Sequence, residues 1–509
     1  MLSRRPLFLP GKHPALATIE GMEMNPTVKP FAALTERSRL AQQKWAARPV
    51  SERLTYIRRL RDLLLAEYPH LCAAVEKDLG RDPVQTLPGE IFGIAAAAKF
   101  LEKRAVRILR PRKVSGTPIW LFGQKNVVHR RPRGLVGIIG TWNYPLYLNA
   151  VQIMQALTAG NAVLWKPSEV APHSAAALAE WIEKANLPEG LFVKLPATRE
   201  AGIQLADADL DHVVFTGHAA TGRKLAAHLG ERLISSTLEL SGCDAQFVLD
   251  DADVELAAKA AWFGCTLNSG QTCIAVRRAF VPRPKYLEFL QVLEPLAAAA
   301  QPLPLAMANQ AARAEELIAD ALAKGARRLG DATVLSGDKR YRPVVLADVR
   351  PEMAVCHQDS FAPIMAVLPY DRLEDAIAAS QQCEYELGVS VFTSDPKRAA
   401  ALAEQLHAGM CTINDVIAPT AHPATPFGGR RASGWGSTQG EEGLLELTVP
   451  QVVTVVPGKF RPHYLTPGSS PLMSLKFFES MYRMAYAPRW TQRVGGFFGV
   501  LATAIGLRK

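Results

Sequence analysis

The sequence lacks the paired cysteines of a disulfide framework or a zinc site. Its seven cysteines are scattered, odd in number and never spaced as CxxC: Cys72, Cys243, Cys265, Cys273, Cys356, Cys383 and Cys411. This distribution excludes a disulfide-stapled scaffold, favours a reducing compartment and offers no metal site. We therefore expect unpaired thiols and no bound metal.

Long hydrophobic runs are also missing. A transmembrane helix needs about 18 consecutive apolar residues, and no run in the chain reaches that length. At the N-terminus, Arg4 and Arg5 precede an apolar stretch, 6–10, that is too short and too interrupted by proline for a secretory signal. The sequence therefore predicts a cytoplasmic protein.

Most of the chain has little net positive charge. The net charge is +10, and residues 457–509 contain eight basic residues and one acidic residue, which leaves +3 for the first 456 residues. A nucleic-acid-binding body would show basic clusters across its folded face. We therefore expect no nucleic-acid partner and assign the basic character to the C-terminal tail.

The pattern of apolar residues indicates two α/β lobes. A chain of 509 residues is too long for one hydrophobic core. Short apolar runs typical of strands buried on both faces alternate with helical segments from Pro132 onward, which predicts parallel sheets joined near Leu240. The expected strands are 135–139, 162–165, 192–195, 213–216, 247–249, 275–281, 364–368, 389–393 and 410–413, with extended, paired strands at 120–128. The expected helices are 89–109, 149–159, 171–185, 286–300 and 311–326, and a helix after Ser51.

Cys273 is the first candidate for chemistry. It ends Asn268-Ser269-Gly270-Gln271-Thr272-Cys273, a small polar turn between a helix end and a strand. An arbitrary lone cysteine is more often a small buried hydrophobic side chain. Here, however, hydroxyl, amide and backbone donors precede the thiol, and Glu239 supplies a carboxylate upstream. Because a thiol that attacks a carbonyl needs a base and oxyanion donors nearby, the turn predicts a nucleophile.

Three further turns follow predicted strands. Trp142-Asn143-Tyr144-Pro145 places an amide where open α/β sheets bind ligands, so Asn143 is a candidate oxyanion donor, although it also suits an ordinary turn. Lys166 and Glu169 are placed to hold a ribose or phosphate, although Ser168 and Glu169 equally suit a helix start. Gly217-His218, with Gly222, opens a helix whose N–H groups are suited to a pyrophosphate, but the pattern is not GxGxxG. The glycine-rich loop 426–436 indicates only a close backbone approach.

The order and spacing of these motifs resemble the NAD(P)-dependent aldehyde dehydrogenase superfamily from about Leu34 to Val456. The resemblance covers seven motifs in order, and the 34 residues from Glu239 to Cys273 are also the family's gap. It implies that Cys273 is the nucleophile, Glu239 the general base, and Asn143 with the Cys273 N–H the oxyanion hole. The cofactor, NAD with some use of NADP, would be held by Trp142, Lys166, Glu169, Gly217, His218, Gly222, Asp359 and Phe361.

The resemblance also implies the architecture and the assembly. It predicts an irregular arm (1–30), a Rossmann-like cofactor domain (31–240) with bridging strands at 118–132, and a catalytic domain (241–425). A return segment with a bridging strand (426–456) and a basic tail (457–509) follow. The protein is expected to form a homo-oligomer, most simply a dimer.

Five positions depart from the family pattern. His218 replaces a serine, Ser241 and Ala362 replace glycines, Asp359 replaces a glutamate and Arg431 replaces a lysine. These departures put cofactor affinity and nicotinamide placement in question. They leave the chemistry of Cys273 unaffected, because the proposed catalytic residues are all present. Two alternatives stay open: a CoA-acylating dehydrogenase, which Glu239 disfavours because a CoA thiolate needs no base, and a catalytically silent binding protein.

The tail combines positive charge with apolar segments. One helical face holds Leu475, Phe478, Met481, Tyr482 and Ala485. After Pro488, the 14 uncharged residues 494–507 are too few to span a bilayer but suit an interfacial segment. The alternative is packing over the body or a partner subunit. The tail is similar to the hydrophobic extension of the fatty-aldehyde branch, which implies a peripheral membrane enzyme for medium- to long-chain aldehydes.

Overall fold

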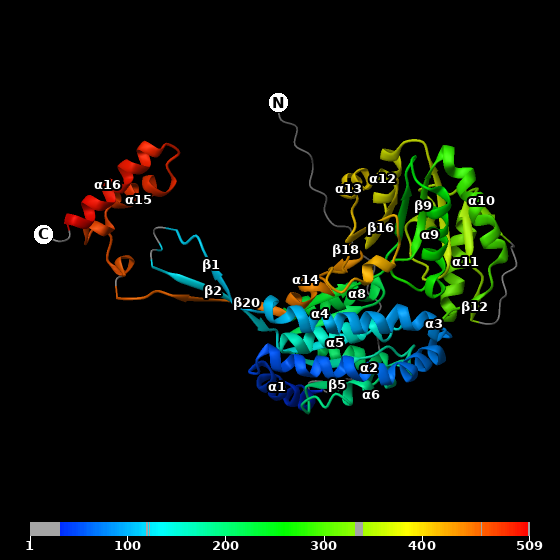
Figure 1. The fold of residues 1–509 in the computed structure, drawn as a ribbon, viewed down its shortest axis with the longest axis horizontal. Coiled ribbons are helices and arrows are strands. Elements are labelled where there is room, and N and C mark those ends of the chain that lie inside the picture. The colour runs from blue at the N-terminus through cyan, green and yellow to red at the C-terminus, as the bar shows by residue number, and fades with distance from the viewer. Residues whose placement is uncertain (1–30, 119–120, 122, 331–338, 460, 507–509) are drawn as a thin grey trace, which may run out of the picture.

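Two mainly parallel sheets organise the chain, as seen in a computed structural model that describes residues 31–118, 121, 123–330, 339–459 and 461–506. The expected arm 1–30 and Trp120 lie outside the described residues. Figure 1 shows the second sheet stacked above the helix-covered first sheet, with a smaller ribbon of strands projecting to one side. The predicted α/β class with parallel sheets is confirmed.

The first sheet has the strand order β19-β7-β6-β3-β4-β5. Its parallel strands are β3 (Leu135–Ile139), β4 (Ala162–Lys166), β5 (Phe192–Lys194), β6 (His212–Thr216) and β7 (Ser235–Glu239), and β19 (Gly434–Trp435) pairs antiparallel with β7. The chain runs outward from β3 to β5 and then returns to β6 on the other side of β3. A crevice forms at such a switch point, beyond the carboxyl ends of the strands, and open α/β sheets bind ligands there.

The second sheet has the strand order β11-β13-β14-β9-β8-β16-β17. Its strands are β8 (Asp244–Val248), β9 (Val276–Pro282), β11 (Arg327–Leu329), β13 (Val344–Ala347), β14 (Ile364–Tyr370), β16 (Gly388–Phe392) and β17 (Met410–Ile413). Phe247 and Phe280 pack into the core on one face, whereas their neighbours Val248 and Val281 pack into the core on the other. Both faces are therefore buried, which is why these strands read as continuous apolar runs.

Helices cover the sheets close to their predicted positions. They are α1 (Ala32–Ala46), α2 (Val50–Leu79), α3 (Pro83–Thr86), α4 (Phe92–Ile108), α5 (Tyr147–Ala159), α6 (Pro172–Glu183), α7 (Arg199–Asp207), α8 (Ala219–Glu231), α9 (Val254–Thr266), α10 (Arg283–Ala299), α11 (Ala308–Ala323), α12 (Leu373–Gln381), α13 (Pro396–Ala403) and α14 (Gly440–Glu446). The segment expected to start one helix at Gly89 begins instead with a π-helical turn, Leu87–Ile91. Such turns often occur at functional sites, and this one carries Glu90.

A third, antiparallel sheet joins distant parts of the chain. It contains β1 (Arg112–Val114), β2 (Lys125–Pro132) and β20 (Thr448–Val455), with β2 in the centre. The strands expected at 120–128 therefore begin later, at Lys125, and the short strand β1 has no periodicity that would have predicted it. The sheet projects from the body toward the C-terminal tail (Figure 1).

The tail folds as a helical hairpin that stands apart from both large sheets (Figure 1). Helices α15 (Leu475–Tyr486) and α16 (Trp490–Gly506) pack on each other. Gly496 and Gly499 allow the close approach, because a Cβ at either position would collide with Ser480. Apolar side chains remain exposed on the pair, namely Leu475, Phe478, Tyr482, Tyr486, Trp490, Val494, Phe497, Phe498, Leu501 and Ile505. No helix in the described residues is long and apolar enough to cross a membrane.

Candidate active site

A cavity of about 480 Å³ opens between the two sheets. From the first sheet it receives the loop after β3, the loop after β6 and the end of β7; from the second it receives the turn before β9 and residues 359–361. Eight of the eleven predicted site residues therefore meet here: Trp142, Asn143, Gly217, His218, Glu239, Cys273, Asp359 and Phe361. Lys166, Glu169 and Gly222 do not line this cavity.

Cys273 follows a strained turn at the mouth of the second sheet. Asn268 and Ser269 have positive φ angles of 52° and 59°, and Gly270 follows with 71°. A side chain at Gly270 would meet the backbone of Ala362 and Pro363, so the turn is pressed against the segment that carries Phe361. Strain of this kind is held in place by its surroundings and is common at active sites.

The Cys273 thiol is half-buried and protonated at rest. Burial raises its pKa, and the carboxylates of Asp244 and Glu239 raise it further, while the Ile274 N–H opposes them. Because the thiolate is the nucleophilic form, a proton acceptor is required when substrate binds. The seven cysteines are all described and all free, as predicted.

Glu239, the last residue of β7, is buried and faces the cavity. Its Oε1 accepts a hydrogen bond from the Thr438 hydroxyl at 3.4 Å, whereas its Oε2 has no partner among the described residues. Burial raises the pKa of this carboxyl well above its usual range. An unpartnered carboxyl oxygen with a raised pKa is suited to accepting a proton from water near neutral pH.

Asn143 is buried in the loop after β3, and its amide is held on both sides. Its Oδ1 accepts a hydrogen bond from the Thr141 hydroxyl at 2.8 Å, and its Nδ2 donates to the Gln271 carbonyl at 3.0 Å. An amide nitrogen carries two hydrogens. The second hydrogen of Nδ2 is therefore left for a ligand oxygen in the cavity.

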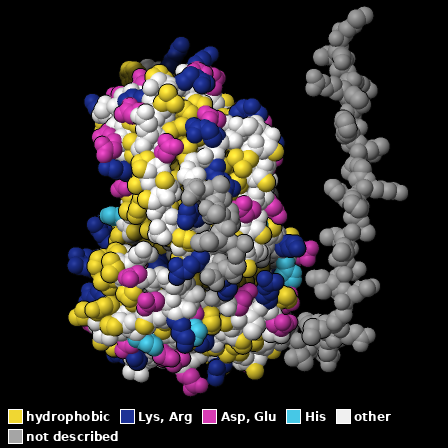
Figure 2. Space-filling view, turned by 90° about the vertical axis from the view of Figure 1, so that its right-hand side faces the viewer, with side chains coloured by type: hydrophobic (Ala, Val, Ile, Leu, Met, Phe, Trp, Pro, Cys, Tyr) yellow, Lys and Arg dark blue, Asp and Glu magenta, His cyan; other side chains and the backbone are white. Residues whose placement is uncertain are grey.

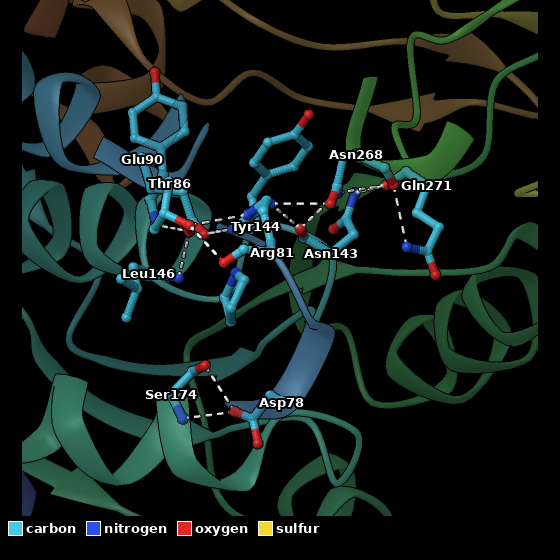
Figure 3. A network of polar contacts seen from close by, with 12 residues as sticks. Asp78, Arg81, Thr86, Glu90, Asn143, Tyr144, Leu146, Ser174, Asn268 and Gln271 are labelled. Atoms are coloured by element: carbon cyan, nitrogen blue, oxygen red, sulfur yellow. Dashed lines mark hydrogen bonds and ion pairs between the residues drawn. The ribbon is translucent and has the colours of Figure 1, made fainter. Parts of the chain in front are cut away.

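A buried arginine ties the Asn143 loop to the Cys273 turn (Figure 3). Arg81 Nη1 donates to the Asn143 carbonyl at 3.0 Å and to Asn268 Oδ1 at 3.1 Å. Its Nη2 pairs with Glu90, whose Oε2 accepts from the N–H groups of Leu146 and Tyr147. Burial lowers the pKa of Arg81 to about 10, so it stays charged at neutral pH. We infer that Arg81 is a positioning residue for both loops.

Replacing this arginine should damage both stability and turnover. Arg81→Met leaves Glu90 buried without its cation, and breaking a buried pair in this way costs about 3–5 kcal/mol. Complete loss of an oxyanion donor lowers kcat by about 10²-fold or more. Because Arg81→Met would misplace Asn143 without removing it, we expect kcat to fall about tenfold or more. Cofactor affinity should stay near the wild-type value, since Arg81 contacts none of the proposed cofactor residues.

The matched control is Arg53→Met. Arg53 is equally buried, but it donates to the Ala159 carbonyl at the end of α5. The control should lose stability and keep kcat. Equal loss of kcat in both variants, measured below their unfolding temperatures, would mean that Arg81 acts through stability alone.

The start of α8 carries the predicted pyrophosphate turn. His218 caps the helix, because its Nδ1 accepts the Ala220 N–H at 3.2 Å. This explains how an imidazole replaces the usual serine. Gly222 lies against the Leu240 side chain, where any Cβ would collide. Gly217 and His218 line the cavity just before the helix, and a helix start of this kind is suited to a pyrophosphate.

Lys166 and Glu169 lie at the end of β4, beside β3 and on the same edge of the sheet. Lys166 Nζ donates to Glu169 Oε2 at 2.8 Å, and Arg199 Nε donates to Oε1 at 3.3 Å. Partial burial alone would raise the pKa of Glu169, but the hydrogen bonds from Lys166 and Arg199 lower it. An ionised Glu169 is therefore available for ribose hydroxyls.

Asp359 orients the segment that faces Trp142. Its Oδ1 accepts the Phe361 N–H at 2.9 Å and lies 3.6 Å from Arg277. Burial raises the pKa of Asp359, while Arg277 and the Ser241 hydroxyl lower it. Ser241, which stands where the family has glycine, thus supplies a hydrogen bond to Asp359, which stands where the family has the longer glutamate. Phe361 and Trp142 form an edge-to-face pair with ring centroids 5.5 Å apart.

Two groups of site residues were missed from the sequence. Gln310 and Arg313 of α11 line the cavity, and Gln310 Nε2 donates to the Phe361 carbonyl at 2.6 Å. A plain alanine-rich helix gives no local signal for them. Asp244 is a second buried carboxyl close to Cys273, and its Oδ1 has no partner among the described residues. Only its position, five residues after Glu239, pointed to the site.

The sequence matches the model of the aldehyde dehydrogenase family over residues 14–453. Among curated relatives, 4,4'-diapolycopene aldehyde oxidase of Methylomonas sp is 35% identical over 422 residues, which cover 81% of this chain and 79% of that protein. A putative succinate-semialdehyde dehydrogenase [NADP(+)] of Mycolicibacterium smegmatis is 33% identical over 440 residues, 84% of each chain. The crystal structure of Mycobacterium tuberculosis aldehyde dehydrogenase complexed with NAD+ is similar with a TM-score of 0.77 and 30% identity, covering 83% of this chain and 89% of that one.

Proposed function

Since the chain belongs to the aldehyde dehydrogenase family and oxidises an aldehyde to the carboxylic acid with NAD(P)+, we propose that Cys273 is the nucleophile of this reaction. The observation that carries the proposal is the meeting of Cys273, Glu239 and Asn143 around one cavity between the sheets. Production of NAD(P)H from aldehydes by the purified chain tests the activity. Dependence of the rate on CoA would favour the acylating alternative.

In the first half-reaction, the Cys273 thiol gives its proton to a water molecule, and the resulting thiolate attacks the carbonyl carbon of the aldehyde. The carbonyl oxygen gains negative charge, and the free hydrogen of Asn143 Nδ2 and the Cys273 N–H stabilise it. Bound NAD(P)+ supplies a nicotinamide that accepts the aldehyde hydrogen with its two electrons. Cys273 is then acylated as a thioester.

In the second half-reaction, Glu239 takes a proton from a water that attacks the thioester carbon. Its unpartnered Oε2 is the acceptor, and Oε1 is anchored by Thr438. The acid leaves, and the Cys273 sulfur is released as a thiolate. A base is needed here because water at neutral pH is a weak nucleophile.

The residues present fit a dinucleotide. We propose that Lys166 and Glu169 hold the adenosine ribose, that Gly217, His218 and Gly222 frame the pyrophosphate, and that Phe361 and Trp142 contact the nicotinamide. Asp359 would hold the second ribose through its carboxylate. The carboxylates of Glu169 and Asp359 and the helix start at α8 are the support for this assignment.

We predict a preference for NAD over NADP in kcat/KM. The ionised Glu169 accepts from ribose hydroxyls and repels a 2′-phosphate. Lys166 and Arg199 lie against it and offset part of that repulsion, so NADP should be used more slowly. In Glu169→Gln the ratio of kcat/KM for NAD to that for NADP should fall. A wild-type preference for NADP would overturn this prediction.

We propose further that the substrates are medium- to long-chain aldehydes, and that a cytoplasmic enzyme meets them at a membrane surface. The support is the hairpin α15–α16, with its exposed apolar side chains and its excess of basic residues. A relative that is 35% identical is named for its action on a diapolycopene aldehyde. An interfacial hairpin would deliver apolar aldehydes to the enzyme.

Two substitutions in the hairpin test this proposal. Phe497 and Phe498 are about half-exposed, at 51% and 60%. In Phe497→Ser/Phe498→Ser we expect weaker sedimentation with anionic vesicles and a lower kcat/KM for long aldehydes, with short aldehydes unaffected. If the wild-type protein stays in the supernatant at low salt and long aldehydes react no faster than short ones, the proposal fails.

We propose that the chain forms a homodimer through the third sheet. Val452, Val453 and Val455 of β20 are exposed, and an unpaired strand edge with apolar side chains favours pairing with another chain. Light scattering measures the assembly. A particle of the monomer mass, 55.4 kDa, would contradict the proposal.

A further inference from the structure

Positive charge is concentrated on one part of the folded body as well as in the tail. Residues 99–133 contain eleven Lys and Arg residues and one acidic residue, Glu102, which gives a net charge of +10. Since residues 457–509 add +7, the rest of the chain carries a net charge of −7. The nearly neutral total of the first 456 residues therefore conceals a local cluster, and the expectation that the basic character belongs to the tail alone is wrong.

Most of the basic residues of this cluster are exposed on consecutive elements of the chain. On α4 and just beyond its end, the spacing i, i+4, i+8 and i+11 puts Lys99, Lys103, Arg107 and Arg110 on one side of the helix. The basic residues continue into β1 and β2. We call the basic face the seven exposed residues Lys99, Lys103, Arg107, Arg110, Arg112, Lys113 and Lys125.

The basic face has no internal counter-charge. None of its seven residues forms an ion pair within the described part of the chain, and Glu102 pairs instead with Arg58 and Arg61 of α2, each at 3.0 Å. The helix dipole accounts for basic residues in the last turn of α4, such as Arg107, but not for Lys99 or for the strand residues. By contrast, the side of the molecule shown in Figure 2 carries acidic and basic side chains intermixed.

The basic face lies at the end of the molecule from which the hairpin departs. Lys125 at the start of β2 is paired in register with Val455 at the end of β20, after which the chain runs into the tail (Figure 1). β1 and β20 occupy opposite edges of the third sheet. A subunit contact along β20 therefore leaves β1 and the outer side of α4 accessible.

We propose that the basic face binds the headgroups of an anionic lipid bilayer and fixes the orientation in which the body meets it. The inference rests on the proposed membrane association and adds a second, electrostatic contact to it. Charge complementarity selects an anionic partner, and the adjacent hairpin with its exposed apolar side chains selects a lipid surface over a nucleic acid. Exposed Val106 and Val114 lie among the basic residues and suit the headgroup boundary.

Neutralising three charges of the basic face tests the inference in the full-length protein. Each basic residue close to an anionic surface changes binding by about fivefold, so Lys103→Gln/Arg107→Gln/Arg110→Gln should lower partitioning by about 100-fold. The measurement is co-sedimentation with phosphatidylcholine vesicles that contain phosphatidylserine, at low salt. Vesicles of phosphatidylcholine alone should bind both proteins weakly and equally.

The control variant removes the same charge elsewhere. Lys194, Arg340 and Lys397 are exposed, lie on β5, β12 (Arg340–Tyr341) and α13, and form no ion pair with the described residues. Lys194→Gln/Arg340→Gln/Lys397→Gln should bind like the wild type. An equal loss in this control would show that only the net charge matters and would overturn the inference.

The remaining outcomes separate this inference from the proposed function. If Phe497→Ser/Phe498→Ser abolishes binding while the basic-face variant binds normally, membrane association stands and the basic face has no part in it. Tighter binding of a single-stranded oligonucleotide than of vesicles, lost in the basic-face variant, would assign the face to nucleic acid instead. All variants should oxidise a short aldehyde normally, because none touches the cavity, and loss of that activity would indicate misfolding.

Discussion

Cys273→Ala should lower turnover roughly 10³-fold or more, because no other group in the cavity replaces the attacking sulfur. Binding of NAD should stay close to the wild-type level, since the proposed cofactor residues lie on the first sheet and on segment 359–361. Steady-state NADH production and cofactor-induced fluorescence quenching measure the two quantities separately.

Two other cysteines provide controls for this substitution. Cys411 is exposed at the second sheet, and Cys265 is buried in its core. Cys411→Ala should be fully active, and Cys265→Ala should lose stability while its folded fraction keeps normal turnover. If Cys273→Ala retained more than a few per cent of wild-type turnover, the assignment of the nucleophile would be wrong.

Glu239→Gln should separate the two half-reactions. Acylation should still release close to one equivalent of NADH in a burst, whereas steady-state turnover should fall about 10²-fold or more because the amide accepts no proton from water. The pKa of Glu239 is raised, so its ionised form accumulates only as pH rises toward and beyond neutrality. Wild-type deacylation should therefore increase with pH over that range, and this increase should disappear in the variant.

Asp244→Asn is the matched control for Glu239→Gln. It removes the other buried carboxyl close to the thiol, whose pKa is also raised by burial. We expect deacylation and its pH dependence to persist. Equal loss of burst and steady-state rates in Glu239→Gln would mean that Glu239 acts earlier, as the acceptor of the Cys273 proton.

The residues around the cavity were predictable where they belong to strand ends. Asn143 and Gly217 follow apolar runs whose alternation with helices indicated a parallel sheet, and parallel strands end at one edge. The same logic brought out Cys273 before β9. The strand that ends at Glu239, β7, was not predicted, because its sequence SSTLE is mostly polar. The strand order could not be predicted. An apolar run indicates that a strand is buried, but it does not indicate which other strands lie beside it in the sheet.

Residues that act across long sequence distances escaped prediction for a physical reason. Arg81 reaches the Asn143 carbonyl and Asn268 through tertiary packing, and nothing in its local sequence distinguishes it from a surface arginine. Gln310 and Arg313 lie on a helix whose periodicity reports only its buried side. The basic face was overlooked because only the net charge of residues 1–456 was considered. That sum includes acidic residues elsewhere on the folded surface, which cancel the local positive charge.

The most direct test of the account is the mass of the peptide that contains Cys273 after a single turnover of Glu239→Gln. The variant is mixed with NAD+ and an aldehyde, quenched in acid during the slow phase, digested and analysed by mass spectrometry. We expect this peptide to gain the mass of the acyl group, close to one per chain, and hydroxylamine to remove it. An unmodified Cys273 peptide after a full burst of NADH, or an acyl group on another residue, would contradict this expectation.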